Sequence, residues 1–300
     1  EDILKNYGAD ILRAWVASSD YSEDLRIDKI ILNQHAESYR KIRNTFRFIL
    51  GNIKDEFTKV DFDSLEISNL PELEKFILHK LFTLDKSVKE NLKNYNFHKL
   101  YKDLLNFCSL DLSSFYFDIR KDVLYCDSLD SKKRKDCIIV LNLILDCLLR
   151  WFAPIFVFTT EEIYSLINKN AESVHELSFA RVPKKWENVD LDKKWKSLFK
   201  IKQEANIAIE EKRTNKEIGS SLEAEIEISI NKNDFNLMND LDLAEYFITS
   251  KATRHENKKE KETTEIVVKK AKGTKCPRCW KIFQDECTRC ENASKEKISK

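Results

Sequence analysis

The segment SKKRKDCIIVLNLILDCLLRWFAPIFVF (131–158) decides the fold, because after its charged start it is apolar over nearly its whole length. A run of this length is too long for an ordinary strand, so we expect a helix that is buried on almost all sides. A membrane span is the alternative. However, Asp146 and Arg150 lie four residues apart within the run, and a charge at mid-membrane costs about 2.5–3.5 kcal/mol. A buried helix is therefore favoured, and Pro154 should end or kink it.

The composition also indicates long helices. The 300 residues include only 4 Gly and 4 Pro, where average usage gives roughly 20 and 15. Because these residues form most tight turns, their scarcity argues against an all-β sandwich and a Rossmann core. Hydrophobic residues make up 42% of the chain and charged residues 34%, so a core can form under a highly charged surface. With a formal net charge of +1, any nucleic-acid surface must come from local segregation of charge.

Apolar residues recur at spacings of three and four along the first half of the chain, as on the buried face of a helix. Leu70-Pro71-Glu72 marks one helix start, with proline in the first turn, and Thr159-Thr-Glu-Glu162 marks another. Four or more long helices with short connections form an antiparallel bundle. The expected helices cover residues 1–19, about 28–51, 71–92, about 97–120 and 131–158, with a further one from 159 and a polar connector at 18–24.

The sequence pattern changes after about residue 170. A charged helix is expected over about 190–214. The segment EAEIEISI (223–230) then alternates strictly between polar and apolar residues, which is typical of a half-buried strand. This strand predicts a small α/β module. The other expected elements of the module are a short helix near 236–247, a solvated and charge-rich loop over 251–261 and a second strand near 265–268.

Two C-x-x-C turns, Cys276-Pro-Arg-Cys279 and Cys287-Thr-Arg-Cys290, stand near the C-terminal end with seven residues between them. Two such turns supply the four thiolates of a tetrahedral zinc site, and four protein ligands indicate a structural metal. Two disulfides would need an oxidising compartment, and a redox C-x-x-C would need a thioredoxin-like strand–helix junction. The sequence supports neither alternative. The other cysteines are interpreted as buried free thiols: Cys108, Cys126, Cys137 and Cys147.

The segment 269–300 is basic, with ten Lys and Arg residues against four acidic ones. Trp280 and Phe283 lie among these charges. This combination suits single-stranded RNA, because bases stack on aromatic rings while phosphates meet basic side chains. An equally open interpretation is that Trp280 forms the small core of the knuckle.

Several segments, taken in order, resemble the C-terminal part of bacterial-type isoleucyl-tRNA synthetases, a class Ia aminoacyl-tRNA synthetase family. The most specific are DYSEDLRI (20–27) and the two C-x-x-C turns; the helical bundle alone would also suit the valine and leucine enzymes. The segments are YGADILRAWVASSDYSEDLRI (7–27), SYRKIRNTFRFILGN (38–52), YNFHKLYKDLLNFCSLDLSSFYFDIRKDVLYCD (95–127), FAPIFVFTTEEIY (152–164), IGSSLEAEIEI (218–228), KCPRCW (275–280) and CTRC (287–290).

The resemblance implies a ligase that forms isoleucyl-adenylate from isoleucine and ATP and then transfers isoleucine to its tRNA. The catalytic core, with its H-I-G-H and K-M-S-K-S motifs, and the editing domain would lie upstream, together with the sites for ATP and Mg²⁺. Because the chain starts at Glu1 without an initiator Met, we interpret it as part of a longer protein. Alone it should be catalytically inactive and should bind the anticodon region of isoleucine tRNA.

The resemblance also implies a mainly α fold in five parts and one structural Zn²⁺. Its partners would be isoleucine tRNA and the upstream catalytic and editing domains, in a cytoplasmic monomer without membrane contact. The five parts are a connector helix after the catalytic core (1–28), the anticodon-binding helical bundle (29–170), a linker with a charged helix (171–218), the small α/β module (219–270) and the zinc-binding knuckle (271–300).

The candidate site residues form two groups besides the zinc ligands. Arg278, Trp280 and Arg289 on the knuckle would contact the anticodon loop, and local packing is the alternative. A basic helix face would meet the tRNA, and a solvated face is the alternative. No catalytic residue is predicted. The helix candidates are Arg40, Arg43, Asn44 and Arg47, and the run 132–135 (KKRK) is either a phosphate contact or a solvated helix start.

Two other functions stay open at this stage. One is a stand-alone zinc-ribbon RNA-binding protein without catalysis, which would begin with Met near residue 1. The other is a valine or leucine enzyme of the same class. Valine enzymes usually end in a coiled-coil arm, which needs sustained heptads. The last 50 residues show none, so the isoleucine family is favoured.

Overall fold

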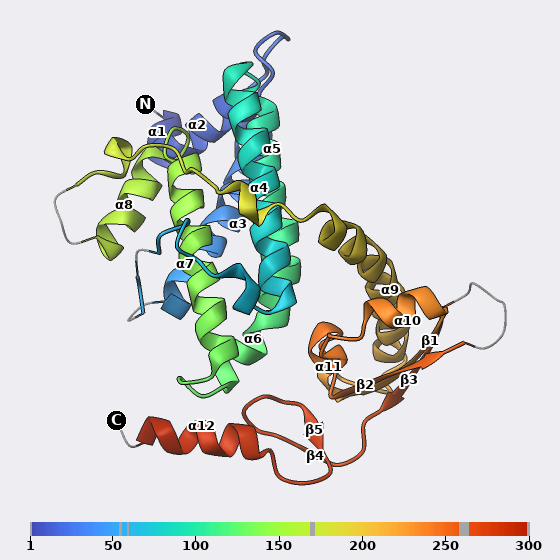
Figure 1. Ribbon diagram of the computed structural model, residues 1–300. Helices are drawn as coiled ribbons and strands as arrows, with labels where there is room; N and C mark the ends of the chain where they lie inside the picture. Colours follow the sequence, from blue (N-terminus) through green and yellow to red (C-terminus); the bar gives the residue numbers. More distant parts are fainter. Residues whose placement is uncertain (1, 54–55, 59, 169–171, 258–263, 299–300) are drawn as a thin grey trace. The chain divides into compact units, whose positions relative to one another are not determined.

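The computed structural model describes residues 2–53, 56–58, 60–168, 172–257 and 264–298 (Figure 1). The chain divides into two compact units. These units are a coarser division than the five predicted parts, whose boundaries stay predictions. The first unit comprises Glu1–Asp118 and Asp136–Glu187, and the second comprises Ile119–Lys135 and Asn188–Lys300.

The first unit is a helical bundle, as the sequence predicts. A helical run continues without a break from α5 (Phe97–Asn106) through the π-helix η2 (Phe107–Tyr116) into α6 (Phe117–Cys126). This run is longer than expected, and most of α6 belongs to the second unit. The other elements are α1 (Asp2–Tyr7), α2 (Ala9–Ser18), α3 (Lys29–Ile53), η1 (Ile67–Asn69), α4 (Glu72–Lys93), α7 (Lys132–Phe152), α8 (Val157–Ile167), η3 (Val174–Glu176) and η4 (Lys184–Trp186).

The buried helix predicted from the apolar run is α7. Most of its apolar side chains are buried in the core, and Leu141, Ile144 and Leu148 are completely buried. Burial of a side chain of this size stabilises the fold by about 1.5–3 kcal/mol. The helix ends at Phe152, ahead of Pro154, because proline lacks the N–H and clashes with the preceding turn.

The expected single helix over 1–19 is interrupted at Gly8. Helices α1 and α2 meet there, and the φ of Gly8 is 82°, a value that glycine adopts without strain. The apolar residues on both sides keep the same helical spacing, so their periodicity does not reveal the break.

The N-terminus of α8 is capped by a carboxylate from another helix. Asp10 of α2 accepts hydrogen bonds from the backbone N–H groups of Phe158 (3.3 Å) and Thr159 (2.8 Å). It also accepts one from the Thr159 hydroxyl at 2.6 Å. Asp10 is buried, and the partial positive charge of the helix end favours its carboxylate. The sequence placed this helix start at Thr159; the structure starts it at Val157 and brings the acid from α2.

The second unit combines one long helix, a small sheet and the C-terminal knuckle. The charged helix α9 (Val189–Thr214) confirms the prediction over 190–214. The remaining elements are η5 (Ser221–Glu223), β1 (Ala224–Ile230), α10 (Lys232–Leu237), α11 (Leu243–Tyr246), β2 (Lys251–Glu256), β3 (Glu265–Lys270), β4 (Thr274–Lys275), β5 (Ile282–Phe283) and α12 (Thr288–Ile298).

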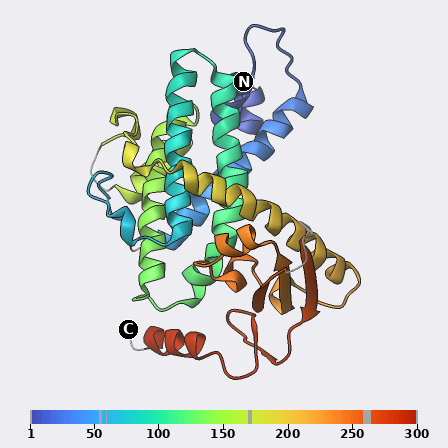
Figure 2. The same cartoon turned by 45° about the vertical axis from the view of Figure 1, so that its right-hand side comes forward.

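The sheet is built around β1, in the order β2-β1-β3. Strand β1 runs parallel to β2 and antiparallel to β3, and Ile226 pairs with Ala252 on one side and Val268 on the other. Its buried residues alternate with half-buried ones, as predicted. Helix α9 lies along this sheet (Figure 2), and its Trp195 is completely buried and meets Tyr246 edge-on at 5.6 Å.

Two expectations for this module were wrong. Residues 251–256, expected to form a solvated loop, are the strand β2. Its sequence KATRHE has no apolar alternation, and its hydrogen bonds to β1 supply the order that periodicity does not indicate. The expected helix over 236–247 is two short helices, α10 and α11, and each has an Asn or Asp side chain as N-cap. Residues 258–261 of the expected loop lie outside the described residues.

None of the helices in the described ranges is long and apolar enough to cross a membrane.

Candidate metal centre

The first C-x-x-C turn closes a short hairpin. Strands β4 and β5 pair antiparallel, with Thr274 opposite Phe283. Gly273 precedes the hairpin with a φ of 130°, and a Cβ there would lie 2.0 Å from the carbonyl oxygen of Phe283. Only glycine therefore permits this close approach. Within the turn, the Trp280 N–H donates to the Cys276 carbonyl at 3.0 Å, and Trp280 adopts a φ of 64°.

The second C-x-x-C turn starts α12. Cys287 precedes the helix and Cys290 lies in its first turn, so both sulfurs lie at the same helix end. The Glu291 N–H donates to the Cys287 carbonyl at 3.1 Å, which fixes this turn.

The four cysteine sulfurs form one cluster. All four Sγ atoms lie within 4.8 Å of one another, and the sulfurs of Cys279 and Cys287 are 3.9 Å apart. A tetrahedral zinc site with Zn–S bonds near 2.3 Å requires sulfur–sulfur distances of about 3.8 Å. Cys276, Cys279 and Cys290 are buried. The four cysteines therefore fit a closed tetrahedral metal site.

The thiols differ in acidity before a metal binds. Burial raises the pKa of Cys276, but hydrogen bonds from the backbone N–H groups of Cys279 and Arg278 outweigh it and lower the pKa to about 7. Burial raises the pKa of Cys279 and Cys290 above the ordinary value. A bound dication would favour the thiolate forms of Cys279 and Cys290, and its binding would release protons.

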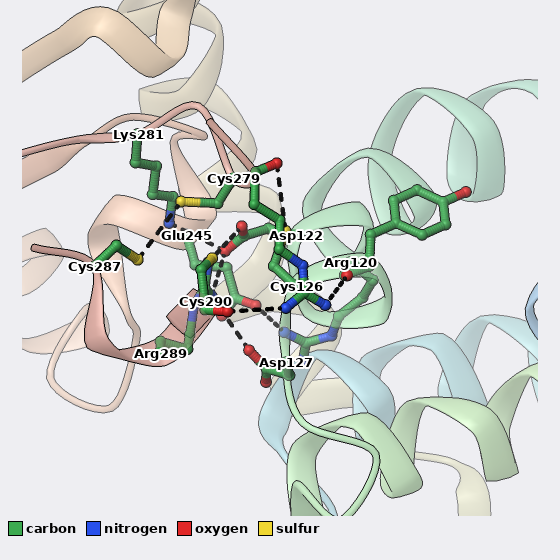
Figure 3. A network of polar contacts seen from close by, with 12 residues as sticks. Arg120, Asp122, Cys126, Asp127, Glu245, Cys279, Lys281, Cys287, Arg289 and Cys290 are labelled. Atoms are coloured by element: carbon green, nitrogen blue, oxygen red, sulfur yellow. Dashed lines mark hydrogen bonds and ion pairs between the residues drawn. The ribbon is translucent and has the colours of Figure 1, made fainter. Parts of the chain in front are cut away.

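The knuckle is attached to α6 by an ionic network (Figure 3). Arg289 donates to both carboxylate oxygens of Asp122, each at 2.8 Å, and to Asp127 at 3.2 Å. The Lys281 ammonium lies 3.3 Å from Asp122. Burial raises the pKa of Asp122, but the hydrogen bonds and charges of Arg289 and Lys281 outweigh it and lower the pKa.

A second ionic contact joins α6 to the sheet module. Arg120 of α6 donates to Glu245 of α11 at 2.7 Å, and the two side chains are only 3% and 8% exposed. Lys133 also pairs with Glu245. The run 132–135 is thus not simply a solvated helix start, because Arg134 is also buried.

Cys126 at the end of α6 packs against the cysteines of the knuckle. It is buried with Cys276, Cys279 and Cys290 in one apolar cluster, and its sulfur lies 3.9 Å from the Arg278 carbonyl. The sequence indicated a buried thiol here, but not its place beside the knuckle. Burial raises the pKa of Cys126 to about 11, so it stays a neutral thiol near neutral pH.

The three knuckle residues predicted to meet RNA differ in their contacts. Trp280 is 61% exposed, so it does not form the core of the knuckle. Arg278 donates to the carbonyls of Tyr125 (2.9 Å) and Cys290 (3.1 Å). Arg289 is bound to the two aspartates described above. Of the three side chains, Trp280 is the one that faces solvent most openly.

The predicted basic face of α3 is exposed. Arg40, Arg43, Asn44 and Arg47 all lie on the surface of the first unit. Arg40 pairs with Glu37. Arg43 donates to the Tyr39 hydroxyl at 3.0 Å and lies 3.4 Å from Glu162. These exposed contacts are weak in water, so the cations can exchange them for an anionic partner.

Sequence reasoning missed the partners of the knuckle. Asp122 of α6 and Asp127, just after that helix, bind Arg289 of the knuckle, yet in the sequence they look like ordinary surface charges. The sequence offers no signal for them, because their role depends on the segment 119–135 lying beside residues far along the chain.

Residues 74–228 match the family described as the anticodon-binding domain of tRNA ligase. An isoleucine–tRNA ligase of Pelagibacter ubique is 57% identical over 291 residues, which cover 96% of this chain and 32% of that protein. An isoleucine–tRNA ligase of Agrobacterium fabrum is 40% identical over 294 residues, 95% of this chain and 30% of that protein. The chain therefore spans about a third of the length of the curated relatives it matches.

A solved ternary complex of Agrobacterium radiobacter LeuRS with tRNA and LeuAMS is similar to this chain, and the match covers 62% of this chain and 21% of the solved protein chain. Its sequence identity to this chain is 14% and the TM-score is 0.48.

Proposed function

The chain belongs to the family of anticodon-binding domains of tRNA ligases, which matches residues 74–228, and we therefore propose that it is the tRNA-binding portion of an isoleucine–tRNA ligase. One observation carries the proposal: two isoleucine–tRNA ligases are 57% and 40% identical to the chain over at least 95% of its length. The complete protein would form isoleucyl-adenylate and transfer isoleucine to its tRNA in the cytoplasm. Activation, with ATP and Mg²⁺, would take place in another part of that protein.

The metal in this proposal is one structural zinc ion. Cys276, Cys279, Cys287 and Cys290 would hold it, and their spacing and burial suit four Zn–S bonds. When bound, zinc would offset half of the charge of the four thiolates and would join the two turns to each other. The sulfurs fill all four positions, so the metal would stabilise the knuckle and take no part in catalysis.

The knuckle would contact the anticodon loop through Trp280. A base can stack on this ring because 61% of the residue is exposed, and stacking is the usual way in which unpaired bases are held. Arg278 and Arg289 would add positive charge beside it while keeping their contacts to α6 and α12. The zinc turns thus present the ring on a rigid support.

The exposed face of α3 would contact the phosphate backbone. Arg40, Arg43, Asn44 and Arg47 recur at spacings of three and four on this face, and all four are exposed. Phosphate contacts of this kind position RNA without reading its sequence. We therefore expect the α3 face to contribute affinity and the knuckle to contribute discrimination.

The proposal is tested by the affinity of the 300-residue chain for isoleucine tRNA and for valine tRNA, at one fixed salt concentration. Tighter binding of isoleucine tRNA supports it. Equal, weak and strongly salt-dependent binding of both tRNAs would mean that the chain supplies only attraction to the backbone, and would refute the assignment of the knuckle to the anticodon.

A further inference from the structure

A single carboxylate contacts both halves of the zinc knuckle. Asp122 of α6 receives two hydrogen bonds from Arg289, each 2.8 Å long. Its second partner is the Lys281 ammonium at 3.3 Å. All three side chains are largely removed from solvent, at 18% exposed for Asp122, 36% for Arg289 and 11% for Lys281.

The two partners of Asp122 belong to different halves of the knuckle. Arg289 lies between Cys287 and Cys290, inside the second C-x-x-C turn. Lys281 follows Trp280 directly, at the end of the first. Zinc would join the two turns to each other, whereas Asp122 joins both of them to the end of α6.

Two further contacts hold the hairpin side of the knuckle. Lys275 pairs with Glu223 at 2.9 Å, and the Ile282 N–H donates to the Ser250 hydroxyl at 2.6 Å. Both contacts reach the sheet module. On the opposite side, Arg289 joins α12 to α6 through its ionic contact with Asp122. Arg278 adds hydrogen bonds to the carbonyls of Tyr125 in α6 and Cys290 in α12. The ionic contact therefore contributes to the orientation of this half of the knuckle.

We propose that Asp122 is a positioning residue for tRNA recognition: through Arg289 and Lys281 it fixes the orientation in which the knuckle presents Trp280 to an unpaired base. The inference rests on the proposed function and goes beyond it, because Asp122 itself would not touch RNA. It assigns to Arg289 the role of an anchor between α12 and α6.

The sign of the effect of Asp122→Asn separates positioning from simple electrostatics. The substitution removes one negative charge near a binding surface for a polyanion. If charge alone mattered, the variant would bind tRNA more tightly. The positioning role predicts the opposite: an approximately tenfold weaker affinity for isoleucine tRNA, which corresponds to about 1.4 kcal/mol, with one zinc per chain retained.

Asp130→Asn is the matched control. Asp130 belongs to the same corner between α6 and α7, but it is 86% exposed and pairs with the exposed Lys135. Its substitution changes the net charge by the same amount and leaves the contacts of Asp122 with Arg289 and Lys281 in place. The control variant should bind tRNA as the unaltered chain does, or slightly more tightly.

Hydrogen exchange of α12 gives a readout that does not depend on RNA. In Asp122→Asn the amides of α12 should exchange faster while those of β1 stay unchanged. If the unaltered chain fails to bind tRNA, the proposed function is wrong, and exchange still reports whether the anchor exists. If exchange in α12 rises but tRNA affinity does not fall, the positioning role is refuted.

Two further variants keep the test decisive if Asp122→Asn does not fold. Asp127→Asn removes only the longer bond to Arg289, at 3.2 Å, and should have a smaller effect in the same direction. Arg289→Gln should weaken binding as much as Asp122→Asn, and the double variant no more than either. Additive losses would mean that Arg289 contacts RNA directly and would overturn the proposal.

Discussion

Replacing Trp280 by alanine separates the contribution of this side chain to RNA binding from its contribution to stability. Trp280 is 61% exposed and has a φ of 64°. An exposed side chain adds little to the free energy of unfolding, and such surface changes usually stay within about 0.5 kcal/mol. We therefore expect Trp280→Ala to leave the fold and the zinc content unchanged.

The expected loss lies in tRNA affinity. Stacking of one base on an aromatic ring contributes about 1–3 kcal/mol, which corresponds to a dissociation constant raised about fivefold to 150-fold. Trp280→Phe keeps a ring and should lose less. Trp280→Gly should lose as much affinity as the alanine variant while the fold becomes slightly more stable, because glycine adopts a positive φ without strain.

The assay is equilibrium binding of isoleucine tRNA at one salt concentration, with urea unfolding of each variant beside it. Phe158→Ala serves as control, because Phe158 is an aromatic residue of the first unit with a similar exposure of 66%. An alanine variant that keeps its affinity would remove Trp280 from the site. An alanine variant that loses stability and affinity together would show that the ring supports the knuckle instead.

Three other predictions concern the fold and the metal. Asp10→Ala should lower the free energy of unfolding by about 1–3 kcal/mol, because two N–H groups and a hydroxyl at the start of α8 lose their acceptor. Asp10→Asn should lower it less. An unchanged free energy of unfolding of Asp10→Ala in urea would contradict this capping role. Gly273→Ala should weaken zinc binding, because its Cβ would lie 2.0 Å from the Phe283 carbonyl oxygen. Gly51→Ala has open space around it, so it should leave the fold as stable or make it more stable and should not change zinc affinity. Equal zinc affinities of the two variants would contradict this prediction. Removal of zinc by a chelator should raise hydrogen exchange in α12 and leave β1 protected, and unchanged exchange in α12 would show that the metal does not hold the knuckle.

The elements that could be predicted from the sequence are those whose own residues show which positions are buried. The alternation of 223–230 gave β1, in which Ala224, Ile226 and Ile228 are completely buried. The apolar run 131–158 likewise gave α7. In both cases one residue pattern determines both the local structure and the buried face.

The elements that the sequence missed depend on contacts from elsewhere in the chain. Strand β2 is polar, and its order comes from its hydrogen bonds to β1. The cap of α8 comes from Asp10, 149 residues before Thr159. No window of residues around either element contains the partner that stabilises it.

The candidate site shows the same division. The spacing of the two C-x-x-C turns predicted the cluster of four sulfurs, because a turn of this type fixes its own geometry. The residues that bind Arg289 of the knuckle, Asp122 and Asp127, lie more than 150 positions before it. The predicted RNA contacts Trp280, Arg278 and Arg289 stay predictions, and the structure distinguishes them by exposure.

The most direct test of the account is the affinity of the chain for isoleucine tRNA and for the same tRNA carrying a valine anticodon. Only the anticodon differs between these two RNAs, so phosphate contacts contribute equally to both. We predict that the unaltered anticodon binds at least about tenfold more tightly, and that Trp280→Ala reduces this ratio. Equal affinities for the two RNAs would contradict the claim that this chain recognises the anticodon.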